Sequence, residues 1–511
     1  MDEQNDPEAM TLEEGAAAAR LASDGQTDSG TAEDAQASGH RPCTDLGNGE
    51  RLADRHGATL RYVEDRERWL CWSGSHWKRN EGGSVHRAAA ETARSIMAEA
   101  ECLSAEPTFN SKDKEQASLR ERMQAHAYTS ESKPRLDAMT ALGAHIPPIS
   151  CQADEFDADP WLLCTPTGVL DLRGDGNVTA CAPEAMLSRC TRARFDPQAV
   201  APVWTAFLEQ IFCGDNELRD WVQRAVGLTL VGVQRDHLFL FCWGDGRNGK
   251  STFLNAILHA LGEYGVSLPP GLLIAKQFES HPTELADLEG ARMAVGAEVP
   301  KGAAWDEVRI KSLTGGDPIR ARKMRQDFYE FPATHTFWIS GNDKPRIRGT
   351  DGGIWRRVRL VPFSAKIAVE DGDLPAKLTA QPEMDGILSW CLDGMREYNA
   401  KGLGKCAAVE SATACYRESE DIVGQFLTEC CNLSPDLTVD KEAMRLALRK
   451  WFTDRGYKTP SDRAIKTDFA VRKIEDGQTH GGVRCWRGIV LNERTAAGAP
   501  DLGRNDYQGG N

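Results

Sequence analysis

The segment "CWGDGRNGKSTFLNAIL", from Cys242 to Leu258, follows the pattern G-x-x-x-x-G-K-[ST]. Its glycines let several backbone N–H groups converge on one phosphate, because no Cβ obstructs them. The lysine of such a loop reaches the β and γ oxygens of a nucleoside triphosphate, and the following hydroxyl can ligate Mg²⁺. We therefore predict a triphosphate-binding loop that consists of Gly244, Asp245, Gly246, Arg247, Asn248, Gly249, Lys250, Ser251 and Thr252.

Two apolar runs further along the chain end in polar side chains that hydrolysis requires. "RMAVGAE" ends in Glu298, which we predict to be the acidic residue and a metal ligand beside Ser251. "THTFWISGN" ends in Asn342, which we predict to hold the attacking water or the γ-phosphate. The carboxyl ends of parallel strands meet at one sheet edge, so both side chains would face the phosphates. The alternatives are an exposed loop glutamate and an Asx turn.

Two adjacent arginines, Arg356 and Arg357, stand directly before another apolar run in "GIWRRVRLVPF". Nucleoside triphosphatases commonly use an arginine to neutralise charge in the transition state. Either residue could serve as this arginine finger, and the alternative is that both are ordinary surface cations. We count both as candidate catalytic residues, together with Lys250, Glu298 and Asn342.

A cluster of basic and aromatic residues lies between the two strands that end in Glu298 and Asn342. Basic groups follow a phosphate backbone and aromatic rings stack on bases, which is how single strands are held without sequence preference. The alternative is a solvated charged face. From this cluster we predict DNA contacts by Arg322, Lys323, Arg325 and Phe328.

The elements that position these residues form an alternating pattern. Residues 235–365 alternate apolar strand-like runs with helix-like or loop segments, which predicts an α/β core over 235–404 with the glycine-rich loop between a strand and a helix. Residues 51–200 mix short strands with an amphipathic helix and predict an α+β N-terminal domain. Residues 201–234 show two helical periods and predict a helical bridge between the two domains.

The remaining segments are two tails and a small C-terminal domain. Residues 1–50 are acidic and lack aromatic residues, which predicts a disordered tail, and 496–511 are expected to be a flexible tail. Residues 405–425 predict a helical linker, and 426–495 show the helix, turn, helix and strand order of a winged-helix-like domain. The alternative for this domain is a small packing module. Its possible phosphate contacts are Arg463, Lys466, Arg472 and Lys473.

The charge balance depends strongly on position along the 511 residues. The formal net charge is −15, but residues 1–50 alone account for −10, so the rest of the chain is only mildly acidic. Local basic clusters can therefore still bind a polyanion. No apolar run approaches the roughly 18 residues of a membrane helix, and no signal peptide is evident. We expect a soluble protein, without a membrane partner, in the cytoplasm of a bacterial host cell.

The fifteen cysteines are scattered along the chain and form no C-x-x-C pair. Because the four ligands of a zinc ribbon usually come as two closely spaced pairs, the spacing argues against such a site. We expect buried, reduced thiols and no metal–thiolate site.

The order of the glycine-rich loop, the strand that ends in Glu298, "IKSLTGGDPIRARKM", "ISGNDKPRI" and "WRRVRLVPF" resembles the superfamily 3 helicases. The resemblance is to the poxvirus-type and phage or plasmid primase-helicase group, and it covers about residues 60–490. It implies an AAA+ type P-loop ATPase, assembled as a homo-hexamer, that uses ATP and Mg²⁺. It also implies that the basic segment is a hairpin in the ring channel, with Lys323 and Arg325 near its tip.

The function implied by the resemblance is an ATP-dependent DNA helicase for phage, prophage or plasmid replication. Its expected partners are single-stranded and forked DNA and a replication initiator or primase. Val299 and Pro300 follow Glu298 where many relatives carry a second acid, and fifty disordered residues would leave no room for a primase domain. The alternative is an ATP-switched origin-binding or assembly factor without processive unwinding.

Overall fold

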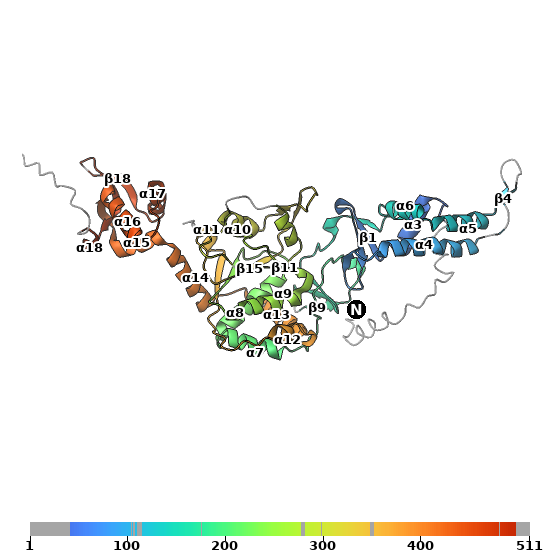
Figure 1. Cartoon of the computed structure of the whole chain (residues 1–511), viewed down its shortest axis with the longest axis horizontal. Helices are drawn as coiled ribbons and strands as arrows, with labels where there is room; N and C mark the ends of the chain where they lie inside the picture. The colour runs from blue at the N-terminus through green and yellow to red at the C-terminus, as the bar shows by residue number, and fades with distance from the viewer. Residues whose placement is uncertain are drawn as a thin grey trace, which may run out of the picture.

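The computed structural model describes residues 41–103, 105, 108–109, 115–174, 176–276, 282–297, 299–347, 352–479 and 481–496. Three folded parts follow one another along the long axis of the molecule (Figure 1). An N-terminal part lies at one end, a central α/β part in the middle, and a small C-terminal part at the other end. None of the described helices combines the length and the apolar character needed to cross a membrane.

The N-terminal part packs helices beside a four-stranded sheet of order β3-β2-β1-β6. In the sequence, a two-stranded pair, β4 (Thr108–Phe109) and β5 (Glu115–Gln116), comes between two of the helices of this part. The sheet strands are β1 (Leu60–Val63), β2 (Arg68–Trp72), β3 (Trp77–Arg79) and β6 (Ser150–Cys151), with η1 (Glu64–Arg66) after β1. The helices are α3 (Asp45–His56), α4 (Ser84–Glu101), α5 (Leu119–Ser130) and α6 (Lys133–Gly143).

We expected a disordered acidic tail over residues 1–50, but the folded region already includes residues 45–50, which form the first half of α3 (Asp45–His56). Thr44 caps α3 by accepting the Gly47 N–H at 3.0 Å. On the same helix the buried Arg51 forms an ion pair with Glu99 of α4 at 2.6 Å. Composition concealed this helix, because its buried residues are mostly polar or glycine. The expected disorder of residues 1–40 lies outside the described residues.

A second small sheet connects the N-terminal part to the central part. It is antiparallel, of order β7-β8-β9, with β7 (Leu162–Thr165), β8 (Gly168–Asp171) and β9 (Asn177–Thr179). Two 3₁₀ turns, η2 (Ala153–Glu155) and η3 (Pro183–Ala185), flank it. The segment after η3 runs along the central part, where the Arg192 and Ala193 N–H groups both donate to the Ala260 carbonyl at 3.0 Å.

The central part is built on a parallel five-stranded sheet of order β11-β12-β15-β10-β16. Its strands are β10 (Phe239–Trp243), β11 (Gly265–Ser267), β12 (Met293–Gly296), β15 (Thr336–Gly341) and β16 (Val358–Pro362). Both faces are covered, so the inner strands β10 and β12 are apolar along their whole length rather than alternating. Leu240 and Cys242 point to one hydrophobic core, and Phe239 and Phe241 point to the other.

Helices cover the two faces of this sheet (Figure 1). The Leu240 face packs against α7 (Pro202–Ile211), α8 (Asn216–Leu230), α9 (Lys250–Leu261), α12 (Leu374–Thr379) and α13 (Gln381–Lys401). The other face packs against η5 (Pro282–Leu288), α10 (Glu307–Leu313), β13 (Ile319–Ala321), β14 (Tyr329–Phe331), α11 (Gly352–Trp355) and α14 (Ala407–Glu420).

The two helices in 201–234 belong to this helical layer instead of forming a bridge. Trp204 of α7 stacks on Phe253 of α9, with ring centroids 5.4 Å apart. A Cβ on Gly227 of α8 would stand 2.2 Å from the backbone nitrogen of Met395 in α13, so these helices pack backbone to backbone. The apolar face seen in the sequence is therefore buried on the sheet.

The C-terminal part has its own hydrophobic core and follows α14. Its order is α15 (Ile422–Cys430), β17 (Cys431–Asp440), α16 (Lys441–Asp454), α17 (Asp462–Val471), β18 (Glu475–Gln478), β19 (Arg484–Leu491) and α18 (Glu493–Ala496). Its sheet is antiparallel, of order β17-β19-β18. The sequence interpretation missed β17, because Pro435 and polar residues interrupt its pattern and a bulge separates Leu433 from Thr438.

Candidate nucleotide site

The glycine-rich loop connects the end of β10 to the start of α9, which is the strand–loop–helix context that its pattern predicts. Gly249 has a φ of 82°, and a Cβ there would lie 2.4 Å from Ile211. A Cβ on Gly244 would lie 2.1 Å from the Phe363 carbonyl oxygen. Close packing therefore requires glycine at both positions, while Asp245, Gly246 and Arg247 between them are exposed.

Lys250 folds back into the loop, and its side chain is buried. Its ammonium donates to the Gly244 carbonyl at 2.7 Å and to the Asn248 Oδ1 at 3.0 Å. Burial lowers the pKa of Lys250, since these acceptors are neutral. A phosphate would offer a charged acceptor at the same place, and such hydrogen bonds are about twice as strong.

Asn342 lies beside this lysine, with its Oδ1 3.0 Å from the Lys250 Nζ. The contact follows from the strand order, because β15 lies between β10 and β12 and Trp243 is in register with Gly341. The Trp243 indole also donates to the Asn342 carbonyl at 2.9 Å. The structure therefore brings together two candidate catalytic residues that are 92 positions apart.

The other predicted phosphate and metal contacts lie near the start of α9. Ser251 is exposed in its first turn, where backbone N–H groups and the helix dipole favour an anion. Arg247 extends to solvent and forms an ion pair with Glu370 at 3.2 Å. Glu298 lies outside the described residues, two positions beyond Gly296, the last residue of β12.

Both arginine-finger candidates lie at the opposite edge of the sheet from the loop. Phe239, the first residue of β10, is in register with Val358 of β16, and its N–H donates to the Arg357 carbonyl at 2.9 Å. A five-residue strand spans roughly 16 Å, which separates these arginines from the loop of the same chain. Arg356 is exposed. Arg357 is half-buried and donates to the Thr314 hydroxyl and the Gly353 carbonyl, both at 3.0 Å.

The basic–aromatic cluster forms a β-hairpin, in which β13 pairs antiparallel with β14. Its connecting loop is exposed at Met324 and Arg325, and Arg325 has a φ of 63°. Phe328 is 45% exposed, and the guanidinium groups of Arg320 and Arg322 lie 4.8 and 5.1 Å from its ring centroid. Arg322, Arg325 and Phe328 are thus gathered in one surface loop.

Lys323 faces Glu289 instead of extending freely from the tip of the hairpin. Its ammonium is 3.6 Å from Glu289 Oε2, and burial lowers its pKa. Glu289 also accepts from the Tyr329 hydroxyl at 3.1 Å and from Arg66 of the N-terminal part at 3.2 Å. Sequence reasoning missed this cluster, because Arg66 and Glu289 are 223 residues apart.

Two of the basic residues proposed as phosphate contacts in the C-terminal part form ion pairs within it. Arg472 pairs with Asp421 at 2.6 Å and with Asp468 at 3.1 Å. Lys466 pairs with Asp476 at 3.1 Å. Arg463 is exposed on α17.

Two family models match this chain. Residues 49–213 match the family described as "D5 N terminal like", and residues 242–357 match a "Family of unknown function (DUF5906)". The first match covers most of the N-terminal part together with α7. The second begins at the end of β10 and ends at Arg357, so it includes the loop, Asn342 and both arginines.

Similar curated proteins come from large DNA viruses. "Putative helicase L207/L206" of Acanthamoeba polyphaga mimivirus is 26% identical over 58% of this chain and 33% of its own length. "Putative helicase 022R" of Frog virus 3 is 27% identical over 53% of this chain and 30% of its own length. "Putative primase C962R" of African swine fever virus is 24% identical over 55% of this chain and 32% of its own length. The chain matches about a third of the length of these relatives.

A solved structure, the apo NrS-1 C terminal region, matches 58% of this chain and 78% of its own, with 11% identity and a TM-score of 0.40. At that TM-score the likeness supports no conclusion about this chain.

The parallel sheet and the loop after β10 define a mixed α/β fold that is consistent with a P-loop ATPase core. The chain carries a D5 N terminal like domain followed by a DUF5906 domain, and it is a distant homologue of viral proteins described as helicases and primases. These comparisons confirm the resemblance drawn from the motifs.

Proposed function

We propose that this chain is an ATP-dependent DNA helicase whose AAA+ type core hydrolyses ATP to move along single-stranded DNA and separate duplex strands. The contact between Lys250 and Asn342 is the observation that carries the proposal, because it supports a site in which Lys250 would bind phosphate and Asn342 would act as the sensor. The descriptions of the relatives as helicases support the same activity.

In this proposal the loop binds the triphosphate through its backbone N–H groups and Lys250. Ser251 and Glu298 would hold Mg²⁺, and the exposed Ser251 hydroxyl in the first turn of α9 fits that role. The bound metal would neutralise charge on the phosphate oxygens. Asn342 would orient the attacking water.

The finger would come from a neighbouring copy, since Arg356 and Arg357 lie at the far edge of the sheet from their own loop. A homo-hexameric ring meets this need, because each interface would join the loop of one protomer to the exposed Arg356 of the next. We therefore propose the hexameric ring together with the helicase activity, because ATP hydrolysis would depend on the arginine of the neighbouring protomer.

The DNA contacts proposed for the ring channel are Arg322, Arg325 and Phe328 of the hairpin, with Lys323 behind them. The exposed loop offers cations and a ring side by side, as single-strand binding requires. The proposed substrates are single-stranded and forked DNA, and an initiator or primase is the proposed partner. The proposed setting is phage, prophage or plasmid replication in the bacterial cytoplasm.

A forked-duplex unwinding assay with ATP tests the proposal, with particle size measured with and without nucleotide. We expect ATP-dependent strand separation and hydrolysis stimulated by single-stranded DNA. Lys250→Ala should abolish both, whereas Lys405→Ala, at an exposed lysine outside the site, should leave both unchanged. A strictly monomeric protein would contradict the assembly.

The second candidate is an ATP-switched origin-binding or assembly factor. The C-terminal part favours it, because the order α15, β17, α16, α17, β18, β19 matches a winged-helix-like module that could bind duplex DNA. Retained duplex binding with absent or DNA-independent hydrolysis would favour this second function over the helicase.

A further inference from the structure

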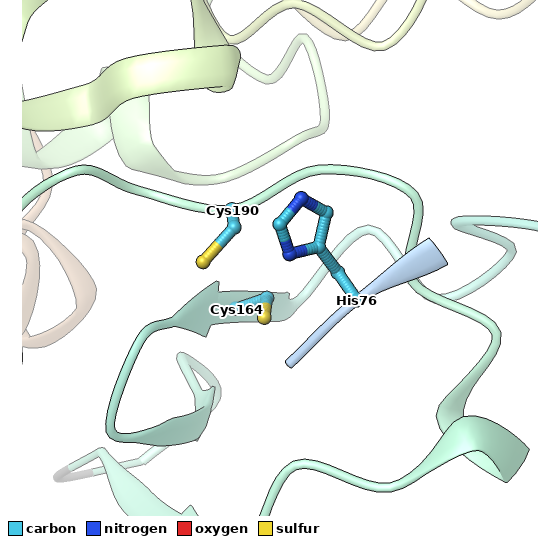
Figure 2. Close-up of side chains that lie close together, drawn as sticks. All are labelled: His76, Cys164 and Cys190. Atoms are coloured by element: carbon cyan, nitrogen blue, oxygen red, sulfur yellow. The ribbon is translucent and has the colours of Figure 1, made fainter. Parts of the chain in front are cut away.

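Three potential metal ligands from distant parts of the sequence meet inside the molecule. His76 precedes β3, Cys164 lies in β7, and Cys190 lies between η3 and α7. Their ligand atoms all lie within 4.8 Å of one another, and all three residues are buried. In Figure 2 the two sulfur atoms and a ring nitrogen of His76 face a common space.

A fourth ligand adjoins this group. Cys181, which follows β9, is half-buried, and the Thr165 carbonyl oxygen that accepts its thiol also lies 3.7 Å from the Cys164 sulfur. Both thiols also point at backbone carbonyls, with Cys164 3.3 Å from the Ser75 oxygen and Cys181 3.5 Å from the Thr165 oxygen. The cluster therefore offers three sulfurs and one imidazole.

We propose that His76, Cys164, Cys181 and Cys190 bind a structural zinc ion. Three thiolates and one imidazole form a usual tetrahedral zinc site, and soft sulfur ligands disfavour Mg²⁺ and Ca²⁺. A tetrahedron with Zn–S bonds of about 2.3 Å has S···S edges of about 3.8 Å. The ligand atoms of His76, Cys164 and Cys190 lie within 4.8 Å of one another and need to contract by about 1 Å to reach that geometry, and Cys181 would move toward them to complete it.

The surroundings of the cluster hold its ligands as a zinc site requires. Glu263 Oε2 lies 2.8 Å from the Nε2 of His76 and accepts the Cys190 N–H at 2.9 Å. This carboxylate fixes the ring through its Nε2, which is the usual arrangement around metal-bound histidines. The Nδ1 faces the Ser75 hydroxyl at 2.9 Å and the Ser73 hydroxyl at 3.3 Å, and a metal bound there would displace these two contacts.

The site would join the N-terminal part to the nucleotide-binding core. Glu263 belongs to η4 (Gly262–Tyr264), which directly follows α9, the helix that begins at Lys250. The Tyr264 hydroxyl accepts the Cys164 N–H at 3.1 Å. Zinc would thus fasten the end of the loop helix to two segments of the N-terminal half.

The proposal departs from the expectation that the cysteines form no metal–thiolate site, which relied on closely spaced pairs. The fold supplies the ligands one at a time from four segments, and His76 and Cys164 are separated by 87 intervening residues. Only tertiary contacts, such as the Trp77 N–H donating to the Leu187 carbonyl at 2.8 Å, bring them together.

Metal analysis of the purified full chain tests the proposal. We expect about one zinc ion per chain by mass spectrometry of the metals, and after chelation we expect Co²⁺ to give the absorption of a tetrahedral thiolate site. Cys164→Ser and Cys190→Ser should abolish both signals. Cys151→Ser, at a buried cysteine of β6 outside the cluster, is the matched control and should keep both.

The Cys181→Ser variant tests the fourth ligand. It should keep cobalt but reduce the sulfur-to-cobalt charge-transfer band by about one third, since two thiolates replace three. An unchanged band would overturn the four-ligand site.

The metal content of the wild-type chain tests the proposed zinc site even if the variants do not fold. A chain that contains no zinc and binds no Co²⁺ after reduction would overturn the proposal, and so would bound iron or a disulfide among the three cysteines. Metal content is measured without ATP or DNA, so the result is independent of the proposed helicase activity.

Discussion

The carboxyl and amino edges of the five-stranded sheet differ in which candidate catalytic residues they bring together. At the carboxyl edge the Lys250 ammonium donates to the Asn342 Oδ1 at 3.0 Å. At the amino edge Arg356 and Arg357 lie a full strand length from that pair. In the proposed nucleotide site, one chain would therefore supply the binding half at one edge of the sheet and present the candidate arginine finger at the other.

The same contrast between free and engaged cations recurs within single segments. Arg356 is exposed, whereas its neighbour Arg357 is held by Thr314 and Gly353. In the hairpin Arg325 is exposed, whereas Lys323 faces Glu289. An exposed cation can reach a partner molecule, while an engaged one mainly stabilises its own chain.

The largest expected effect is at Arg356. Replacing Arg356 by alanine should lower the kcat for ATP hydrolysis by about 10³-fold, because the transition-state charge loses its neutralising group. Nucleotide affinity should change little. Steady-state phosphate release measures the first quantity, and titration with a fluorescent nucleotide measures the second.

A mixing experiment determines which chain supplies the arginine. Arg356→Ala retains Lys250, and Lys250→Ala retains Arg356, so mixed rings should contain some complete sites and recover part of the activity. If the mixture stays as inactive as its two components, the division of the site between the two sheet edges is wrong.

The second-largest expected effect on ATP hydrolysis is at Asn342, which lies beside Lys250 at the carboxyl edge of the sheet. Asn342→Ala removes the acceptor beside Lys250 and should lower hydrolysis by about 10²-fold, as loss of one positioned polar group typically does. Thr336→Ala, at the opposite end of β15, is the matched control. Equal activity of the two variants would remove Asn342 from the site.

The carboxyl edge of the sheet was the part most open to prediction from sequence. The loop residues are contiguous, and the pattern specifies a preceding strand and a following helix, which β10 and α9 supply. Asn342 could be named because an apolar run ends there. Its distance from Lys250 could not be known, since it depends on β15 lying between β10 and β12.

Features that depend on long-range contacts could not be predicted from the sequence. The ion pair of Glu289 with Arg66 and the group formed by His76, Cys164 and Cys190 both join the N-terminal part to later segments. The spacing of these residues in the sequence indicates neither contact. The start of α3 was missed because its buried face contains Asn48 and Arg51, which are satisfied only by tertiary partners. Local patterns report local structure, and these contacts are not local.

The hairpin extends the comparison to DNA binding. Arg325→Ala should reduce the dependence of log affinity on log salt by about 0.7 for single strands, which is one phosphate contact. Lys323→Ala should change that slope less, because this lysine is engaged by Glu289. Fluorescence anisotropy at several salt concentrations measures both, and a larger effect at Lys323 would reverse the assignment.

The smallest expected effect on catalysis is at Arg357. Its hydrogen bonds to Thr314 and Gly353 connect the start of β16 to the end of α10, so Arg357→Ala should lower the free energy of unfolding by about 1–3 kcal/mol. The urea midpoint should fall with an unchanged m-value. Turnover of the folded variant should stay close to that of the wild type. A loss of turnover as large as that of Arg356→Ala, without loss of stability, would make Arg357 the finger and would show that an engaged arginine can leave its partners to reach a neighbouring chain.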